Sequence, residues 1–183
     1  MEPYLYPTQP YPDERGNAML TRCADVPAAV EFIWQSVVGV PLQRDTPHTP
    51  AEGETAWVSS VVLLFGEWNG AIRVDCSWEL ARRVTAQMYE MDVDMVPNEV
   101  ACDAVAELAN MIAGAAKTVL GIRSRHSLPT VVRGDSYENT LPNSRPFAQY
   151  GFGAGSDHLS VTLLRRDSLI KQAEPLKWGL RAN

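Results

Sequence analysis

Apolar residues recur at helical spacing in three segments of the chain. The first follows Asp25, a residue type that caps helices, and carries Pro27 in its first turn. Ser77 precedes the second segment, and the third begins after Pro97 and ends at Gly121. The pattern therefore predicts three helices. In the first of them the apolar positions are Val26, Val30, Ile33, Trp34 and Val37.

The remaining patterned segments favour strands. Residues 55–77 are rich in β-branched and aromatic side chains, and Asn69-Gly70 marks a tight turn, which predicts a hairpin. Residues 122–134 are also extended, with Pro129 favouring an edge or a bulge. Residues 145–166 predict a second hairpin around GAGSD. Because helices and strands come in blocks, the expected fold is α+β, an antiparallel β-sheet with long helices packed on it.

The two ends of the chain differ from this patterned region. Four prolines and three tyrosines fall within the first 12 residues, so residues 1–24 are predicted to be a disordered arm, or alternatively a partner-docking arm. Residues 25–166 form the predicted domain, and residues 167–183 a C-terminal tail. A chain of 183 residues fits one domain with tails.

Composition narrows the classes of partner and cofactor. The net charge is −6 and no cluster of basic residues exceeds two in a row, which argues against nucleic acid and anionic membranes. Neither a membrane span nor a secretory signal is present, and three scattered cysteines fit reduced thiols, so we expect a cytoplasmic protein. No metal site and no cofactor are expected, because the three histidines are isolated: His48, His126 and His158.

The third helix carries a polar stripe of unusual composition. On a helical wheel the stripe is roughly 80° wide, and the opposite face is apolar. Alanines 106 and 113 flank the stripe on one side, which would let the backbone of another protein come close. The stripe consists of Asp103, Glu107, Asn110, Gly114 and Lys117. The expected core face consists of Val105, Leu108, Ile112, Ala116 and Val119.

Most polar stripes on amphipathic helices are solvated faces, and the stripe of the third helix could be one as well. Solvated faces are normally built from Glu, Lys, Gln and Arg, which favour helices. Asn110 and Gly114 break that rule together, and local departures of this kind tend to fall at functional positions. Residue choice alone, however, identifies no chemistry.

The segment DAVAELANMIAGAAKTVL, with SLPTVVRG downstream, resembles the signature of the CheC/CheX chemotaxis phosphatase family. The matching positions are Asp103, Glu107, Asn110 and Pro129. The resemblance extends over the first predicted hairpin and the helix after it, and covers about residues 26–166. Only 18 residues separate Asn110 from Pro129, and the helix after Ser77 has arginines in place of a second Glu-x-x-Asn. The chain therefore resembles single-site CheX more closely than CheC.

This resemblance implies hydrolysis of the aspartyl phosphate on a CheY-like response regulator, in chemotaxis or related two-component signalling. Glu107 and Asn110 would be the catalytic residues. Asn110 would position water for in-line attack, and Glu107 would pair with a lysine of the receiver. Asp103 and Gly114 would be partner-docking positions, whereas Lys117 is expected to be solvated. Mg²⁺ would be supplied in the receiver partner and not bound by this chain.

Two alternatives remain open on the same fold. The chain could be a non-catalytic receiver-binding or signalling adaptor module, although a pure docking surface has no need of an amide at Asn110. It could also be a structural subunit of a motor-switch or scaffold assembly. The last strand bears on assembly, because Leu159, Val161 and Leu163 alternate there with polar residues. If this strand lies at a sheet edge, it predicts a homodimer formed through strands.

Overall fold

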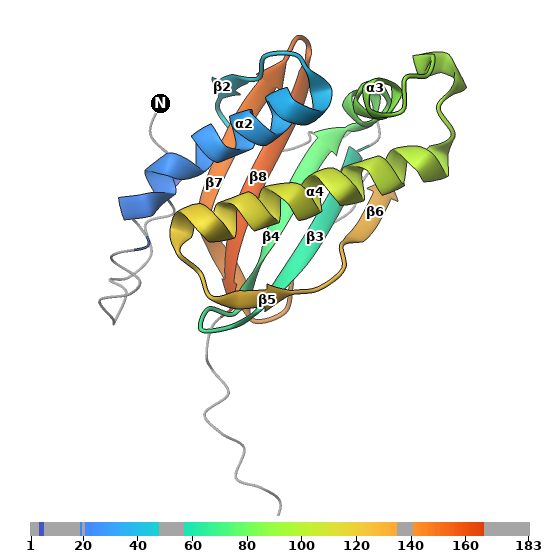
Figure 1. Ribbon diagram of the computed structural model, residues 1–183. Helices are drawn as coiled ribbons and strands as arrows, with labels where there is room; N and C mark the ends of the chain where they lie inside the picture. The colour runs from blue at the N-terminus through green and yellow to red at the C-terminus, as the bar shows by residue number, and fades with distance from the viewer. Residues whose placement is uncertain (1–3, 6–18, 20, 48–56, 135–140, 167–183) are drawn as a thin grey trace, which may run out of the picture.

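The computed structural model describes residues 4–5, 19, 21–47, 57–134 and 141–166. In this part of the chain three α-helices cover one face of an antiparallel sheet, which confirms the predicted α+β fold (Figure 1). The helices are α2 (Val26–Val38), α3 (Trp78–Met88) and α4 (Asn98–Leu120). Two short 3-10 turns accompany them, η1 (Cys23–Asp25) and η2 (Val93–Met95).

The described sheet has the strand order β1-β7-β8-β4-β3-β5, and every neighbouring pair is antiparallel. β2 also pairs with β7, and β6 also pairs with β3, so that each outer edge consists of two short strands. The bounds are β1 (Tyr4–Leu5), β2 (Gln43–Asp45), β3 (Trp57–Gly66), β4 (Gly70–Ser77), β5 (Ser124–His126), β6 (Thr130–Gly134), β7 (Ser144–Ala154) and β8 (Asp157–Arg166).

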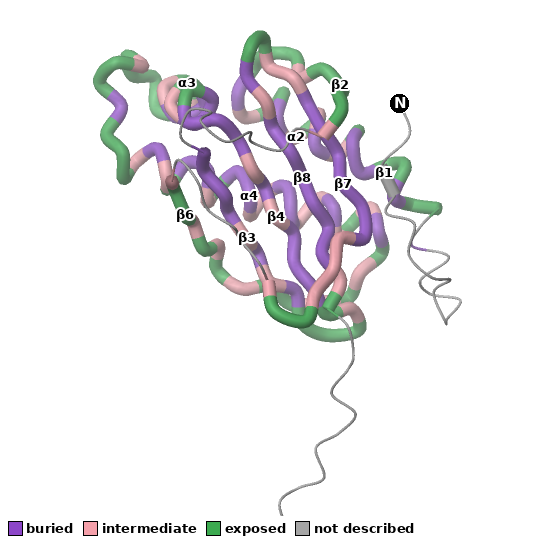
Figure 2. Tube along the Cα trace, turned by 180° about the vertical axis from the view of Figure 1, so that it is seen from behind, coloured by how far each residue is buried: buried purple, intermediate pink, exposed green. Residues whose placement is uncertain are grey.

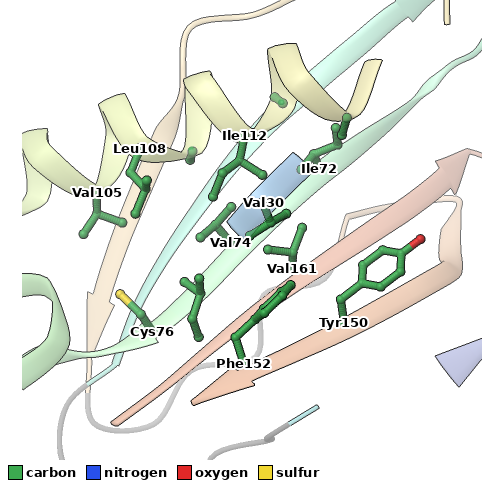
Figure 3. Close-up of a cluster of buried hydrophobic side chains, with 14 of the residues drawn as sticks. Val30, Ile72, Val74, Cys76, Val105, Leu108, Ile112, Tyr150, Phe152 and Val161 are labelled. Carbon is green, nitrogen blue, oxygen red and sulfur yellow. The ribbon is translucent and has the colours of Figure 1, made fainter. Parts of the chain in front are cut away.

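The core lies between the helices and this sheet. α4 crosses the central strands, and its side chains Val105, Leu108 and Ile112 point toward Ile72 and Val74 of β4 (Figure 3). Each of these five side chains is at most 1% exposed. The core face predicted for the third helix is thus confirmed, except that Val119 is only partly buried.

Two predicted helix starts have different outcomes. The Ser77 hydroxyl accepts a hydrogen bond from the Leu80 N–H (3.2 Å) and donates one to Asp157 Oδ1 (3.1 Å), so the predicted cap is confirmed. Asp25 does stand at the N-cap position of α2, but its side chain caps nothing. Its backbone is already helical because η1 runs directly into α2, whereas a capping side chain needs an extended backbone at that residue.

The first hairpin forms as predicted, but its turn is longer than Asn69-Gly70. β3 and β4 pair as far as Leu64 and Gly70, Phe65 and Gly66 continue β3 in its pairing with β5, and the turn spans residues 67–69. Gly70 belongs to β4, where a Cβ would lie 2.0 Å from the carbonyl oxygen of Leu164. The glycine therefore allows close strand packing.

The prediction that the last strand is a sheet edge is wrong. β8 lies between β4 and β7 and is hydrogen-bonded to both, so it offers no free edge to a second copy. Both of its faces are covered, since Ser160 and Thr162 are as buried as Leu159, Val161 and Leu163. Alternation of apolar and polar residues indicates that one face of a strand is buried, but it does not indicate whether the strand lies at the centre or the edge of a sheet. The homodimer itself stays a prediction.

The domain boundary at residue 24 needs a correction. Met19 and Cys23 are buried in the core, and the Tyr150 hydroxyl donates to the Cys23 carbonyl oxygen (3.0 Å). Tyr4 and Leu5 pair with β7. The apolar pattern upstream of Asp25 is too short to be recognised as part of a helix. The rest of the predicted arm and the tail over residues 167–183 lie outside the described residues.

On the face of the sheet away from the helices, several polar residues of the central strands are partly or fully buried, and Figure 2 shows from this side how far each residue along the strands is buried. Arg73 and Asp75 of β4 form an ion pair there, with 2.8 Å between Nε and Oδ2 and side chains 25% and 14% exposed. Burial raises the pKa of the Asp75 carboxyl, while Arg73 and the Ser59 hydroxyl act in the opposite direction. The desolvation of this carboxylate is therefore only partly compensated.

Asp75→Asn is expected to change the pH dependence of stability. A carboxyl whose pKa is raised by folding stabilises the native state at low pH, and this contribution is lost as the pH rises through the native pKa. The free energy of unfolding of the variant, relative to wild type, should therefore be more favourable at about pH 7 than at about pH 4. Urea unfolding at both pH values measures it. Asp94→Asn, at a carboxylate 89% exposed, is the control; an equal trend in both variants would contradict the expectation.

Candidate active site

α4 places the predicted site residues along one line of the molecular surface. The helix begins after Pro97 and ends at Gly121, whose left-handed backbone (φ 68°) forms the C-cap. Between these ends most of its alanines face the sheet or the neighbouring helices and are completely buried. These fully buried alanines are Ala101, Ala104, Ala109, Ala113 and Ala116.

The polar stripe lies on the face of α4 that points away from the core. Asp103 and Glu107 are exposed, and the other three residues of the stripe are half-buried. We call this surface the α4 ridge; it consists of Asp103, Glu107, Asn110, Gly114 and Lys117. Ala106 borders the ridge as predicted, but Ala113 is fully buried and does not. The difference arises because α2 and α3 also pack against α4, so its covered face is wider than packing on the sheet alone would make it.

Glu107 and Asn110 are neighbours one turn apart, and their Cβ atoms should be about 5–6 Å from each other at this spacing. Neither side chain has a hydrogen-bond or ion-pair partner among the described residues. A carboxylate and a carboxamide are thus presented together, with their polar atoms available to another molecule. The fold does not use them to hold itself together.

Gly114 is not required by the packing of this chain. A Cβ built at this position would meet nothing within 4 Å, and the residue has ordinary helical backbone. An alanine would fit and would favour the helix by roughly 0.5–1 kcal/mol. The glycine keeps the ridge low one turn beyond Asn110.

Sequence reasoning missed the partner of Lys117. Its Nζ lies 3.2 Å from His126 Nδ1, and since an ammonium group can only donate, Nδ1 must be the acceptor. The sequence pattern predicts a solvated Lys117 and an isolated His126. The available signal was Gly121, because a left-handed C-cap after α4 turns the chain back and brings β5 alongside the helix (Figure 1).

The edge formed by β5 and β6 runs beside α4 and contains Pro129. Both strands pair with β3, and Pro129 lies between them, which agrees with the predicted edge position. Leu128, just before it, is 87% exposed. Farther along β6, the Arg133 guanidinium stacks 3.7 Å from the ring centroid of Trp78 and so attaches this edge to α3.

The two arginines that α3 carries in place of a second Glu-x-x-Asn have structural partners. Arg82 donates to the Val93 carbonyl oxygen and lies 3.7 Å from the Asp94 carboxylate. Arg83 donates to the carboxylate of Asp157 and to the carbonyl oxygen of Ala154. α3 thus presents no second pair of the Glu107–Asn110 type.

The described residues contain no group of three or more His, Cys, Asp or Glu side chains placed to hold a metal. His48 lies outside them. All three cysteines are free thiols, two of them buried and Cys102 half-buried, and burial raises the pKa of each. Within the same residues no helix has the length and apolar character that spanning a membrane requires.

Comparison with known proteins places this geometry in a family. The model of the chemotaxis phosphatase CheX matches residues 58–153. CheX from Vibrio vulnificus is 20% identical with a TM-score of 0.61, over 78% of this chain and 99% of that chain. The CheX of a CheX-CheY-BeF3-Mg²⁺ complex from Borrelia burgdorferi is 17% identical. Its TM-score is 0.60, and the match covers 80% of this chain and 98% of that chain.

A third similar structure is FliY from Thermotoga maritima, 15% identical with a TM-score of 0.59, over 85% of this chain and 91% of that chain. No curated protein matches the sequence. At these identities the solved structures establish a common fold. The family match covers more than half of the sequence and includes Glu107 and Asn110, and the chain therefore belongs to the CheX family of chemotaxis phosphatases.

Proposed function

We propose that this protein hydrolyses the aspartyl phosphate of a CheY-like receiver domain, with the α4 ridge as its active surface. One observation carries the proposal: Glu107 and Asn110 stand side by side on the ridge without partners among the described residues. The complex of a similar CheX with CheY, BeF3 and Mg²⁺ supports a CheY-like protein as the partner. The family match supports phosphatase chemistry.

Asn110 suits the task of positioning the attacking water. An acyl phosphate is already activated, so orientation for in-line attack is most of what a catalyst must add. The amide oxygen of Asn110 can accept a hydrogen bond from water, and it carries no negative charge that would repel the phosphoryl oxygens. A carboxylate at the same position would introduce that repulsion.

Glu107 has a different proposed role. Its carboxylate is exposed and has no partner among the described residues, so it can form an ion pair with a lysine of the receiver on docking. Asp103 lies one turn earlier on the same exposed line and would add a peripheral contact. Gly114 would let the receiver backbone approach beyond Asn110.

Mg²⁺ belongs to the receiver in this proposal. The chain itself would supply only the positioned amide and the docking contacts, and no cofactor of its own. The non-catalytic adaptor is the competing function on the same surface: such a protein would bind phosphorylated receivers without accelerating loss of phosphate.

The proposal is tested by following the release of phosphate from ³²P-labelled CheY-like receivers of the same organism. Wild-type protein should accelerate release, and Asn110→Ala should lose at least about nine-tenths of the acceleration with binding nearly intact, because a positioned water acts mainly in the transition state. Gln35→Ala, at an exposed amide on α2, is the control. Binding of every receiver without acceleration would favour the adaptor.

Glu107→Gln should reduce affinity as well as rate, because a docking ion pair also stabilises the ground-state complex. The concentration of phosphorylated receiver at half-maximal rate should rise in this variant. Glu79→Gln removes an exposed carboxylate in the first turn of α3 and should leave that concentration unchanged. If Glu107→Gln also leaves the half-maximal concentration unchanged, Glu107 has no docking role.

Gly114→Ala separates stability from docking. The added methyl group has open space in this chain and should stabilise α4 by about 0.5–1 kcal/mol. If a receiver backbone approaches the ridge at this point, the same methyl group should weaken docking. Urea unfolding and the half-maximal concentration measure the two effects. A more stable variant with unchanged docking would show that the partner does not approach Gly114.

A further inference from the structure

A cavity of about 370 Å³ lies where the end of α2, the outer side of α3 and the β7–β8 turn meet. None of its lining residues belongs to α4, so it is separate from the α4 ridge. Its volume is within the range of small-molecule sites. Much of its wall is apolar and comes from Val38, Val40, Pro41, Leu80 and Val84.

Trp34 lines this cavity and carries an unsatisfied donor. The residue is 0% exposed, and its indole N–H has no acceptor among the described residues. A buried donor of this kind costs roughly 1–3 kcal/mol when it stays unpaired, and native proteins rarely leave one so. Because the indole has no exposed surface, a ligand acceptor reaches it only after the cavity wall moves to admit it, and it then removes this penalty.

Arg83 contributes a cation to the same cavity. Its side chain is 48% exposed, and its contacts with Asp157 and Ala154 both use the Nη2 atom. A guanidinium has five N–H donors, and the described residues use only those on Nη2, so those on Nε and Nη1 remain for a ligand in this part of the structure. Arg83 therefore adds charged donors to a wall that is otherwise mostly apolar.

We propose that this cavity binds a small organic carboxylate with an apolar body. The body would occupy the apolar wall, and the carboxylate oxygens would accept hydrogen bonds from the Trp34 indole and the Arg83 guanidinium. Water could satisfy the indole N–H, but an apolar group gains by displacing poorly ordered water from such walls. The inference does not depend on the activity of the α4 ridge.

The proposal is tested by NMR on ¹⁵N-labelled full-length protein, with octanoate and benzoate as probes and benzyl alcohol as the uncharged comparison. The chain has five tryptophans, and Trp34→Phe identifies the Trp34 indole signal by its loss. That signal should shift saturably with the carboxylates. Trp34→Phe and Arg83→Gln should each weaken carboxylate binding by about fivefold to tenfold, whereas Arg83→Gln should barely affect benzyl alcohol.

Matched variants distinguish the site from general effects. Arg82→Gln changes the neighbouring arginine of α3, which does not line the cavity, and should leave binding unchanged. Val40→Trp fills the cavity from its rim, where Val40 is 47% exposed, and should abolish binding without removing a core side chain. It also tests the site if Arg83→Gln fails to fold after losing its contact with Asp157.

Two outcomes would overturn the proposal. One is a Trp34 indole signal that shows contact with water only and no saturable response to either carboxylate. The other is carboxylate binding that persists in both Val40→Trp and Trp34→Phe. Either result is independent of phosphate release from receivers, so the two proposals fail separately.

Discussion

The packing of α4 against the centre of the sheet is the interaction on which the rest of the structure depends. Fully buried alanines let the helix lie close to its neighbours, while Val105, Leu108 and Ile112 fill the space above β3 and β4. Burying one such aliphatic side chain contributes about 1.5–3 kcal/mol. Asn110 and Gly114 together cost the helix roughly 1.5 kcal/mol in propensity. The free energy gained by burying the inner face of α4 therefore outweighs the low helix propensity of Asn110 and Gly114 on its outer face. The outer face can therefore carry residues that suit a partner.

The surroundings of α4 hold the α4 ridge in a fixed frame. Gly121 ends the helix and reverses the chain, the Lys117–His126 hydrogen bond joins the end of the ridge to β5, and Arg133 on Trp78 ties β6 to α3. Reacting groups must be placed to within a fraction of an ångström, and groups on a packed helix are better placed than groups on loops.

The elements and the ridge could be predicted because they depend on local pattern. Ser77 and the 3.6-residue period are local signals, and each corresponds to a helix start or a buried face in the structure. Contacts between distant segments could not be predicted. The central place of β8 is set by its pairing with β4, about 85 residues earlier (for example, Val74 with Val161), and alternation along β8 carries no trace of it. The burial of Cys23 likewise depends on Tyr150.

The shape of the α4 ridge also constrains the kind of substrate. Enzymes acting on small molecules usually enclose them in a concave pocket, whereas Glu107 and Asn110 stand on the outward face of a helix, which is convex. A convex surface cannot by itself exclude water or surround a reacting group. It can, however, enter a cleft that already holds the reacting phosphate, its metal ion and its charged neighbours. For the proposed function two side chains would then be sufficient, because the receiver domain would supply the remaining parts of the site around its aspartyl phosphate.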